Sequence, residues 1–175
     1  MFELGREHPL RRLLAGLVEN TFTAEVGICD PAVTEYVSGL LVDFVHVDRI
    51  FRLRTVDGEA IRDLSRMEAE AHLVGGADQS RRARLVNRYI GDFTLFWTGV
   101  YPEALRPRCS GADRLREYLL QGKRSYTIAS ELTPQGEHPP AELLRALSDE
   151  FEFCVHGLQL VRGELERLRA ESRSN

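Results

Sequence analysis

The sequence has few cysteines and no long hydrophobic run, and both features limit what the chain can be. Its three cysteines, Cys29, Cys109 and Cys154, are odd in number and widely spaced, and none belongs to a CxxC or Cys/His zinc pattern. We therefore expect reduced thiols. The longest uncharged apolar run is the nine residues from Phe93 to Tyr101. It is far shorter than the roughly 20 residues of a membrane helix. The first residues also lack a signal-peptide core, so we expect a cytoplasmic protein without a membrane partner.

Lysine is almost missing: Lys123 is the only lysine among the 23 basic residues. The net charge is −4, and it is unevenly distributed. Basic residues outnumber acidic ones in residues 77–130, whereas acidic residues dominate the segments on either side. An acidic chain is a poor general ligand for nucleic acid, so we expect a nucleic-acid partner to be unlikely compared with a second copy or another protein.

The composition and the periodicity predict one helical domain. A chain of 175 residues with 43% hydrophobic and 29% charged residues is long enough to build a core without metals or disulfides. No segment alternates with the period of a β-strand, whereas apolar residues recur every three or four positions. We expect an all-α, single-domain bundle of about six helices over residues 1–170, followed by a disordered polar tail at 171–175.

Local signals set the expected helix boundaries. Proline at position 9 favours a first helix there, and Asp30 followed by Pro31 is typical of a capped helix start. The segment 133–140, which is rich in proline and glycine, predicts a linker. The remaining helices are expected at 31–51, 59–74, 78–98 and 112–130, and a long last helix carries an apolar stripe from Leu144 to Leu168. This C-terminal helix is heptad-like near its end, which favours a homodimer as an alternative to core packing alone.

Five polar residues are predicted on or beside apolar helix faces. Asp43 and His46 flank the stripe of the second helix, Glu68 and His72 lie one turn apart on the third, and Asp92 lies on the fourth. A buried carboxylate needs a partner, because burial without one costs several kcal/mol.

Three kinds of partner are open for this candidate polar cluster. The favoured interpretation is pairing with arginine or histidine. A second is a divalent metal site made by Glu68, His72 and Asp92 and completed by Asp43 or His46, since helical bundles hold metals in this way. A third is a metal-free acid/base site. The chain has neither the paired Glu-x-x-His repeats of di-iron bundles nor a His-Asp dipeptide, so no resident cofactor is predicted.

Four arginines, Arg81, Arg82, Arg84 and Arg88, crowd the start of the fourth helix, where the helix dipole disfavours positive charge. They form a candidate anion-binding site for phosphate, nucleotide or an RNA backbone. The favoured alternative is that they pair with the acidic flanking segments.

Small residues predict close helix packing at two places. Gly91 costs about 1 kcal/mol relative to alanine within a helix, so a close crossing there is expected. Gly122, Ser125 and Ala129 share one face of the fifth helix and predict a second close approach.

No segment carries a recognisable catalytic or cofactor signature, and this favours a non-catalytic role over an enzyme. The leading hypothesis is an interaction or oligomerisation module. The alternative is a polar pocket among the second, third and fourth helices that serves an enzyme or sensor. The third is anion or nucleic-acid binding by the arginine-rich middle of the chain.

Overall fold

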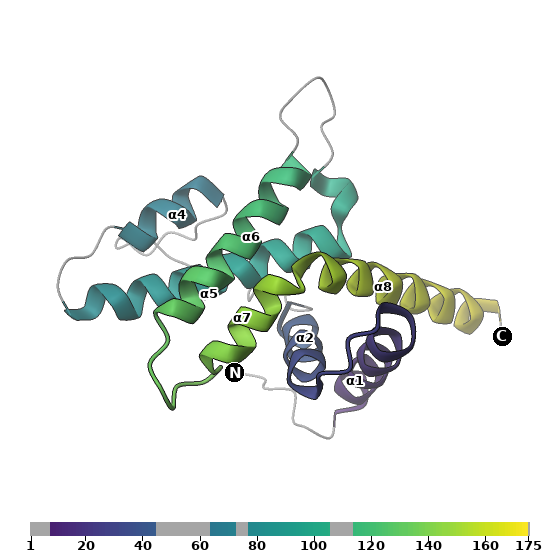
Figure 1. The fold of residues 1–175 in the computed structure, drawn as a ribbon. Coiled ribbons are helices and arrows are strands. Elements are labelled where there is room, and N and C mark those ends of the chain that lie inside the picture. Colours follow the sequence, from purple (N-terminus) through teal and green to yellow (C-terminus); the bar gives the residue numbers. More distant parts are fainter. Residues whose placement is uncertain (1–7, 45–63, 73–76, 106–113, 175) are drawn as a thin grey trace.

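The part of the chain that the computed structural model describes, residues 8–44, 64–72, 77–105 and 114–174, is mostly helical and contains no strand (Figure 1). This confirms the predicted all-α bundle with a long C-terminal helix. Two short turns accompany the α-helices: a π-helical turn, Phe22–Val26, continues the first helix, and a 3-10 turn, Pro102–Leu105, follows the long central one. The α-helices are α1 (Pro9–Thr21), α2 (Pro31–Phe44), α4 (Leu64–His72), α5 (Ala77–Val100), α6 (Arg114–Glu131), α7 (Ala141–Asp149) and α8 (Phe151–Ser174).

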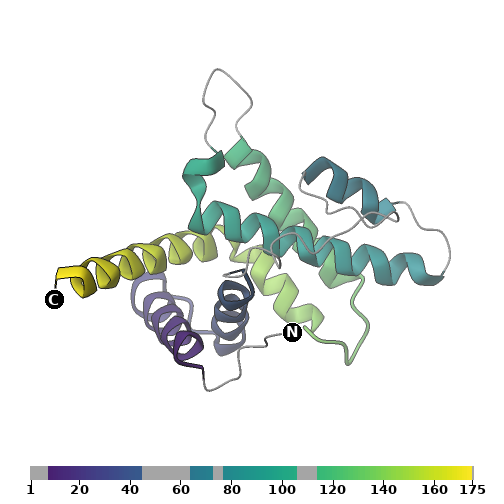
Figure 2. The same ribbon diagram turned by 180° about the vertical axis from the view of Figure 1, so that it is seen from behind.

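Helix α5 is the centre of the packing. It contacts α4, α6, α8 and α2, and Figures 1 and 2 show it passing through the body from one edge to the other. From Val86 to Phe96 nearly every side chain is buried, and Ile90 and Leu95 are completely enclosed. A helix buried on most sides has room for polar residues only where they find partners.

The predicted starts of α1 and α2 are confirmed. Pro9 and Pro31 are the first residues of their helices, where a missing backbone N–H costs nothing. The Asp30 carboxylate accepts a hydrogen bond of 2.8 Å from the backbone N–H of Ala32. Gly27 adopts a left-handed φ of 86° after the π-helical turn, and this conformation separates α1 from α2.

The predicted long last helix is present as α8, but it begins later than the apolar stripe from Leu144 indicated, because the structure divides the segment at Glu150 into α7 and α8. This division gives seven α-helices in the described residues where about six were expected. The apolar stripe did not reveal the break because Leu147 of α7 and Phe151 of α8 are both buried in the same core. The helix α8 then continues to Ser174, through most of the segment 171–175 that was expected to be a disordered tail.

Other helix boundaries differ by smaller amounts. Helix α5 begins at Ala77, one residue before the expected cap at Asp78. Leu85, an apolar residue of the predicted fourth helix, is 46% exposed. The predicted stretches of the second and third helices beyond α2 and α4 lie outside the described residues, in 45–63 and 73–76.

The close contacts predicted at Gly91 and Gly122 are confirmed. A Cβ atom at Gly91 would lie 2.7 Å from the ring of Tyr126, which crosses α5 at this point. A Cβ atom at Gly122 would overlap the ring of Phe151 and lie 2.5 Å from Thr94 Oγ1. Missing side chains at these positions allow α6 to approach both α5 and α8.

No helix in the described ranges is long and apolar enough to cross a membrane.

We expect Gly122→Ala to destabilise the protein by about 1–3 kcal/mol, because a well-packed core must shift to accept the added carbon. Gly163→Ala in α8 is the matched control, since nothing lies within 4 Å of its Cβ position. That change removes a flexible residue from a helix and should stabilise the protein by up to about 1 kcal/mol. Denaturant unfolding measures both values, and equal stabilities of the two variants would contradict the packing role of Gly122.

Candidate functional site

A buried carboxylate in the middle of α5 connects three helices. Asp92 is only 6% exposed, and its Oδ1 atom accepts two hydrogen bonds. The Tyr36 hydroxyl of α2 donates one at 2.6 Å, and the Tyr126 hydroxyl of α6 donates the other at 2.8 Å. Short bonds of this kind to an ionised acceptor are stronger than those between neutral groups.

Arg88, one turn before Asp92, adds a positive charge to this network. Its Nε donates a 3.1 Å hydrogen bond to the Tyr36 hydroxyl and lies 4.0 Å from Asp92 Oδ2. The guanidinium carbon also lies 5.7 Å from the centre of the Tyr36 ring, a cation–π distance. All hydrogen bonds and ion pairs that Arg88 makes with the described residues use Nε. The two terminal nitrogens of its guanidinium therefore remain available to another group.

The surroundings keep both tyrosines protonated. Burial and the nearby Asp92 charge raise the pKa of Tyr36 and that of Tyr126 well above the ordinary tyrosine value. Burial lowers the pKa of Arg88, but the charges and hydrogen bonds of Tyr36 and Asp92 outweigh this effect and raise it. At neutral pH the described part of the network therefore contributes two hydroxyl donors and one cation around the carboxylate.

The network lies beside a cavity of about 370 Å³, which we call the Asp92 cavity. Its volume is at the lower end of the range of small-molecule sites, roughly 300–1,000 Å³. Its walls come from α1, α2, α5 and the segment that enters α7, and they carry charges of both signs. The lining residues are Arg11, Ala32, Glu35, Tyr36, Gly39, Leu40, Asp43, Arg88, Asp92, His138, Pro139, Pro140 and Leu143.

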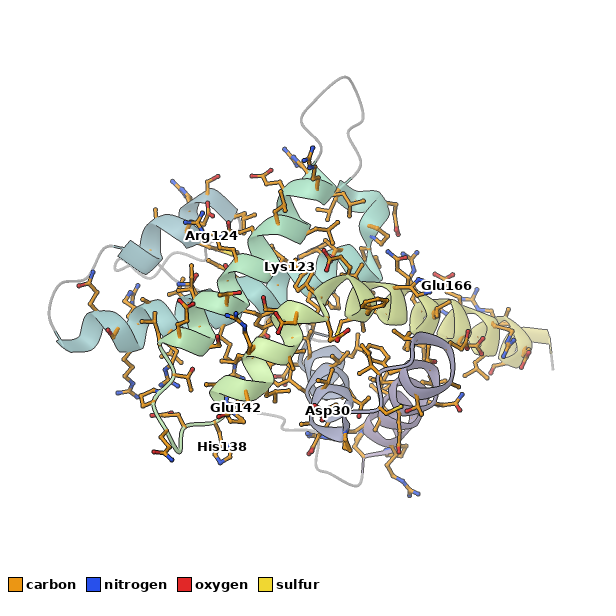
Figure 3. The ribbon with its side chains drawn as sticks, viewed as in Figure 1. Asp30, Lys123, Arg124, His138, Glu142 and Glu166 are labelled. Carbon is orange, nitrogen blue, oxygen red and sulfur yellow. The ribbon has the colours of Figure 1, made fainter. Side chains whose placement is uncertain are left out.

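An ion pair holds the linker between α6 and α7 against the same side of α5. Arg84 lies one turn before Arg88, and its Nη1 is 3.2 Å from the Glu137 carboxylate. The Arg84 side chain is 8% exposed and that of Glu137 is 48% exposed, so water screens this pair from the Glu137 side. His138, which Figure 3 labels in the linker, follows directly and lines the Asp92 cavity with Pro139. The linker predicted at 133–140 thus becomes one wall of the site.

The structure brings only part of the predicted polar cluster together. Asp43 and Asp92 line the Asp92 cavity, whereas Glu68 lines a different cavity between α4, α5 and α6. His46 lies outside the described residues. His72 is the last residue of α4, and its side chain is not among the described ones. Within the described ranges, no group of three or more His, Cys, Asp or Glu residues could hold a metal ion.

Three of the four arginines predicted as an anion-binding group have different partners among the described residues. Arg82 Nη2 lies 2.5 Å from the buried Glu70 carboxylate, Arg84 pairs with Glu137, and Arg88 binds Tyr36. Arg81 is exposed. Pairing of this kind within the molecule is the alternative that the sequence favoured.

Sequence reasoning missed the two tyrosines that hold Asp92. Tyr36 stands beside Val37 in the apolar stripe of α2, and nothing in that spacing marks it as a partner of Asp92. Gly91 was the available signal for Tyr126, because the missing side chain makes room for its ring. The signal predicted a close crossing but not which residue would cross.

Comparison with known proteins adds no relationship: no family model, no curated protein and no solved structure matches the chain.

We expect Tyr36 and Tyr126 to titrate far later than a free tyrosine, whose pKa is about 10. In the native protein, Tyr126→Phe should leave the phenolate absorbance step near pH 10 unchanged and remove amplitude only at higher pH. Because the folded pKa is raised, the stabilisation that these neutral tyrosines contribute is complete below pH 10 and falls as the pH rises above it.

The same titration in denaturant is the control, because the unfolded variant should lose amplitude from the step near pH 10. If native Tyr126→Phe already lost amplitude in that step, Tyr126 would not be shielded as the structure indicates.

Proposed function

We propose that the chain is a binding protein that holds a small zwitterionic molecule in the Asp92 cavity. The observation that carries the proposal is the state of Arg88. Tyr36 and Asp92 fix its guanidinium through Nε, and its terminal nitrogens make no hydrogen bond to the described residues. An arginine fixed in this way is prepared to bind a carboxylate through two parallel hydrogen bonds.

Acidic groups in the same cavity favour a ligand that also carries a positive charge. Glu35 and Asp43 line the same cavity from α2. Glu35 is exposed, and its carboxylate makes no ion pair or hydrogen bond with the described residues. A ligand with a carboxylate at Arg88 and an ammonium group at Glu35 would satisfy both side chains, whereas a simple anion would leave Glu35 without a partner.

The chemistry of the network favours binding over turnover. Two of its groups are tyrosines with raised pKa values, so at neutral pH they donate hydrogen bonds and do not act as bases. Their hydroxyls are already committed to Asp92. The network is therefore suited to holding Arg88 in place.

Isothermal titration calorimetry with ω-amino acids tests this proposal. We expect glycine, β-alanine, γ-aminobutyrate or ε-aminocaproate to bind, according to the separation of the two charges. Butyrate and butylamine, which each carry only one charge of γ-aminobutyrate, should bind more weakly. Arg88→Gln and Glu35→Gln should each weaken binding about tenfold, which corresponds to about 1.4 kcal/mol.

Arg12→Gln and Glu19→Gln are the matched controls, because both residues are exposed on α1 and do not line the cavity. These changes should leave the affinity unaltered. Failure of all four amino acids to bind, or equal binding by butyrate alone, would overturn the zwitterion proposal.

A second candidate function, self-association, has one observation in its favour. An apolar groove of about 380 Å³ lies along α8, and Leu41, Val100, Leu158, Val161 and Leu165 form its floor. One turn further along α8, Leu168 is 37% exposed. Charges of both signs, on Arg162, Glu166 and Arg169, border the groove, so a second copy of α8 offers complementary charges.

Sedimentation equilibrium tests this candidate. If α8 pairs with a second copy, the measured mass should exceed the 19.9 kDa of one chain. Leu168→Glu should then reduce the mass to that of one chain. Leu120→Glu on α6 is the control, because Leu120 is 60% exposed and should tolerate the charge without a change in mass. A wild-type mass of one chain across the concentration range would exclude the dimer.

A further inference from the structure

A second cavity, of about 460 Å³, lies on the other side of α5 from the Asp92 cavity and is separate from the function proposed above. We call it the Asn87 cavity. Helices α4, α5 and α6 each contribute to its walls. The lining residues are Glu68, Gln79, Ser80, Ala83, Asn87, Gln121, Arg124, Ile128 and Leu132.

Asn87 is a buried amide with an unused acceptor. The residue is only 6% exposed, and its Nδ2 donates a 2.8 Å hydrogen bond to the backbone oxygen of Ala83. Among the described residues, none donates a hydrogen bond to its Oδ1. This oxygen is open to the cavity, where it can accept a hydrogen bond from a ligand that supplies an N–H group.

Two further acceptors line the same cavity. Gln121 Nε2 donates a 3.1 Å hydrogen bond to Ser125 Oγ, which leaves its Oε1 as an acceptor. The Glu68 carboxylate is half-buried and makes no hydrogen bond or ion pair with the described residues. Together with Asn87, these residues favour a ligand edge rich in N–H donors over one rich in carbonyl groups.

The rest of the lining sets the shape and the charge of the ligand. Ala83, Ile128 and Leu132 supply apolar surface, which suits a flat ring. Arg124 belongs to the lining but is itself exposed, and it makes no ion pair with the described residues. In Figure 3, Arg124 extends from α6 on the side where α4 lies in that view. Its guanidinium is a partner for an anionic group at the cavity mouth.

We propose that the Asn87 cavity binds a mononucleotide whose base carries an exocyclic amino group. The amino group of such a base, and in guanine the ring N–H beside it, donates to the acceptors of Asn87, Gln121 and Glu68, the ring lies on the apolar wall, and the phosphate meets Arg124. Guanine suits the site best, because its neighbouring N–H and NH₂ groups match the two oxygens of a carboxylate.

The lining distinguishes this ligand from simpler ones. A bare phosphate would engage Arg124 and leave the three acceptors unused. A metal ion would find one carboxylate, Glu68, which is too few anionic ligands for a dedicated site. Only a ligand that carries both N–H donors and an anionic group can bind the three acceptors and Arg124 at the same time.

Titration calorimetry with GMP, AMP, CMP and UMP tests this inference on the full chain. We expect GMP to bind most tightly and UMP, which has no exocyclic amino group, to bind least. Glu68→Gln should weaken GMP about tenfold and UMP much less. Arg124→Gln should weaken GMP about tenfold but leave guanosine, which has no phosphate, unchanged.

Arg114→Gln on α6 and Glu142→Gln on α7 are the matched controls, because both residues are exposed and lie outside the cavity lining. Asn87→Leu keeps the approximate size of the side chain and removes its acceptor, so it should weaken GMP binding. Equal binding of UMP and GMP, or no binding of any nucleotide, would overturn the inference. Arg88 and Glu35 do not line this cavity, so their variants should leave GMP binding intact, and the two sites can therefore succeed or fail separately.

Discussion

The fold depends on one constraint: a carboxylate in the middle of a buried helix must be compensated. Asp92 lies where α5 is enclosed on most sides, and burial of an unpartnered charge would cost several kcal/mol. Tyr36 and Tyr126 bring hydroxyl groups to it from α2 and α6. Tyr126 reaches Asp92 only because its ring passes over Gly91, where a side chain would collide with it. The same requirement therefore sets the sequence of α5 and the positions of the two helices beside it.

Much of the fold followed from the sequence, since apolar spacing and proline positions reflect local physics. Pro9 and Pro31 begin their helices as expected, and the glycine at 122 marks a close helix contact. The break at Glu150 was missed because a one-residue interruption keeps the apolar period, so both helices face one core. Asp92 was predicted on or beside an apolar helix face, and it is buried by the surrounding helices although Leu85, two turns earlier, is exposed. Face assignment fails where a helix has neighbours on most sides.

The partners of the polar residues could not be predicted in the same way. Tyr36 lies 56 positions before Asp92, and a contact over this distance in the chain depends on how whole helices pack. Glu68 and Asp92 were grouped because both lie on apolar faces, but they line separate cavities. The two cavities share α5 as a wall, because residues 100° apart on a helix face different neighbours. Asn87 and Arg88, adjacent in sequence, therefore serve different sites.

The least favourable residues of α5 lie together, between Arg84 and Asp92. This stretch contains two arginines inside the helix, an amide whose oxygen accepts no hydrogen bond from the described residues, a helical glycine and a buried carboxylate. The glycine lowers helix stability by about 1 kcal/mol, and each buried polar group costs free energy unless it has a partner. A core selected only for stability would replace them with leucine or alanine. Such departures from local preference are expected at functional sites, and three of these residues, Asn87, Arg88 and Asp92, line the two cavities.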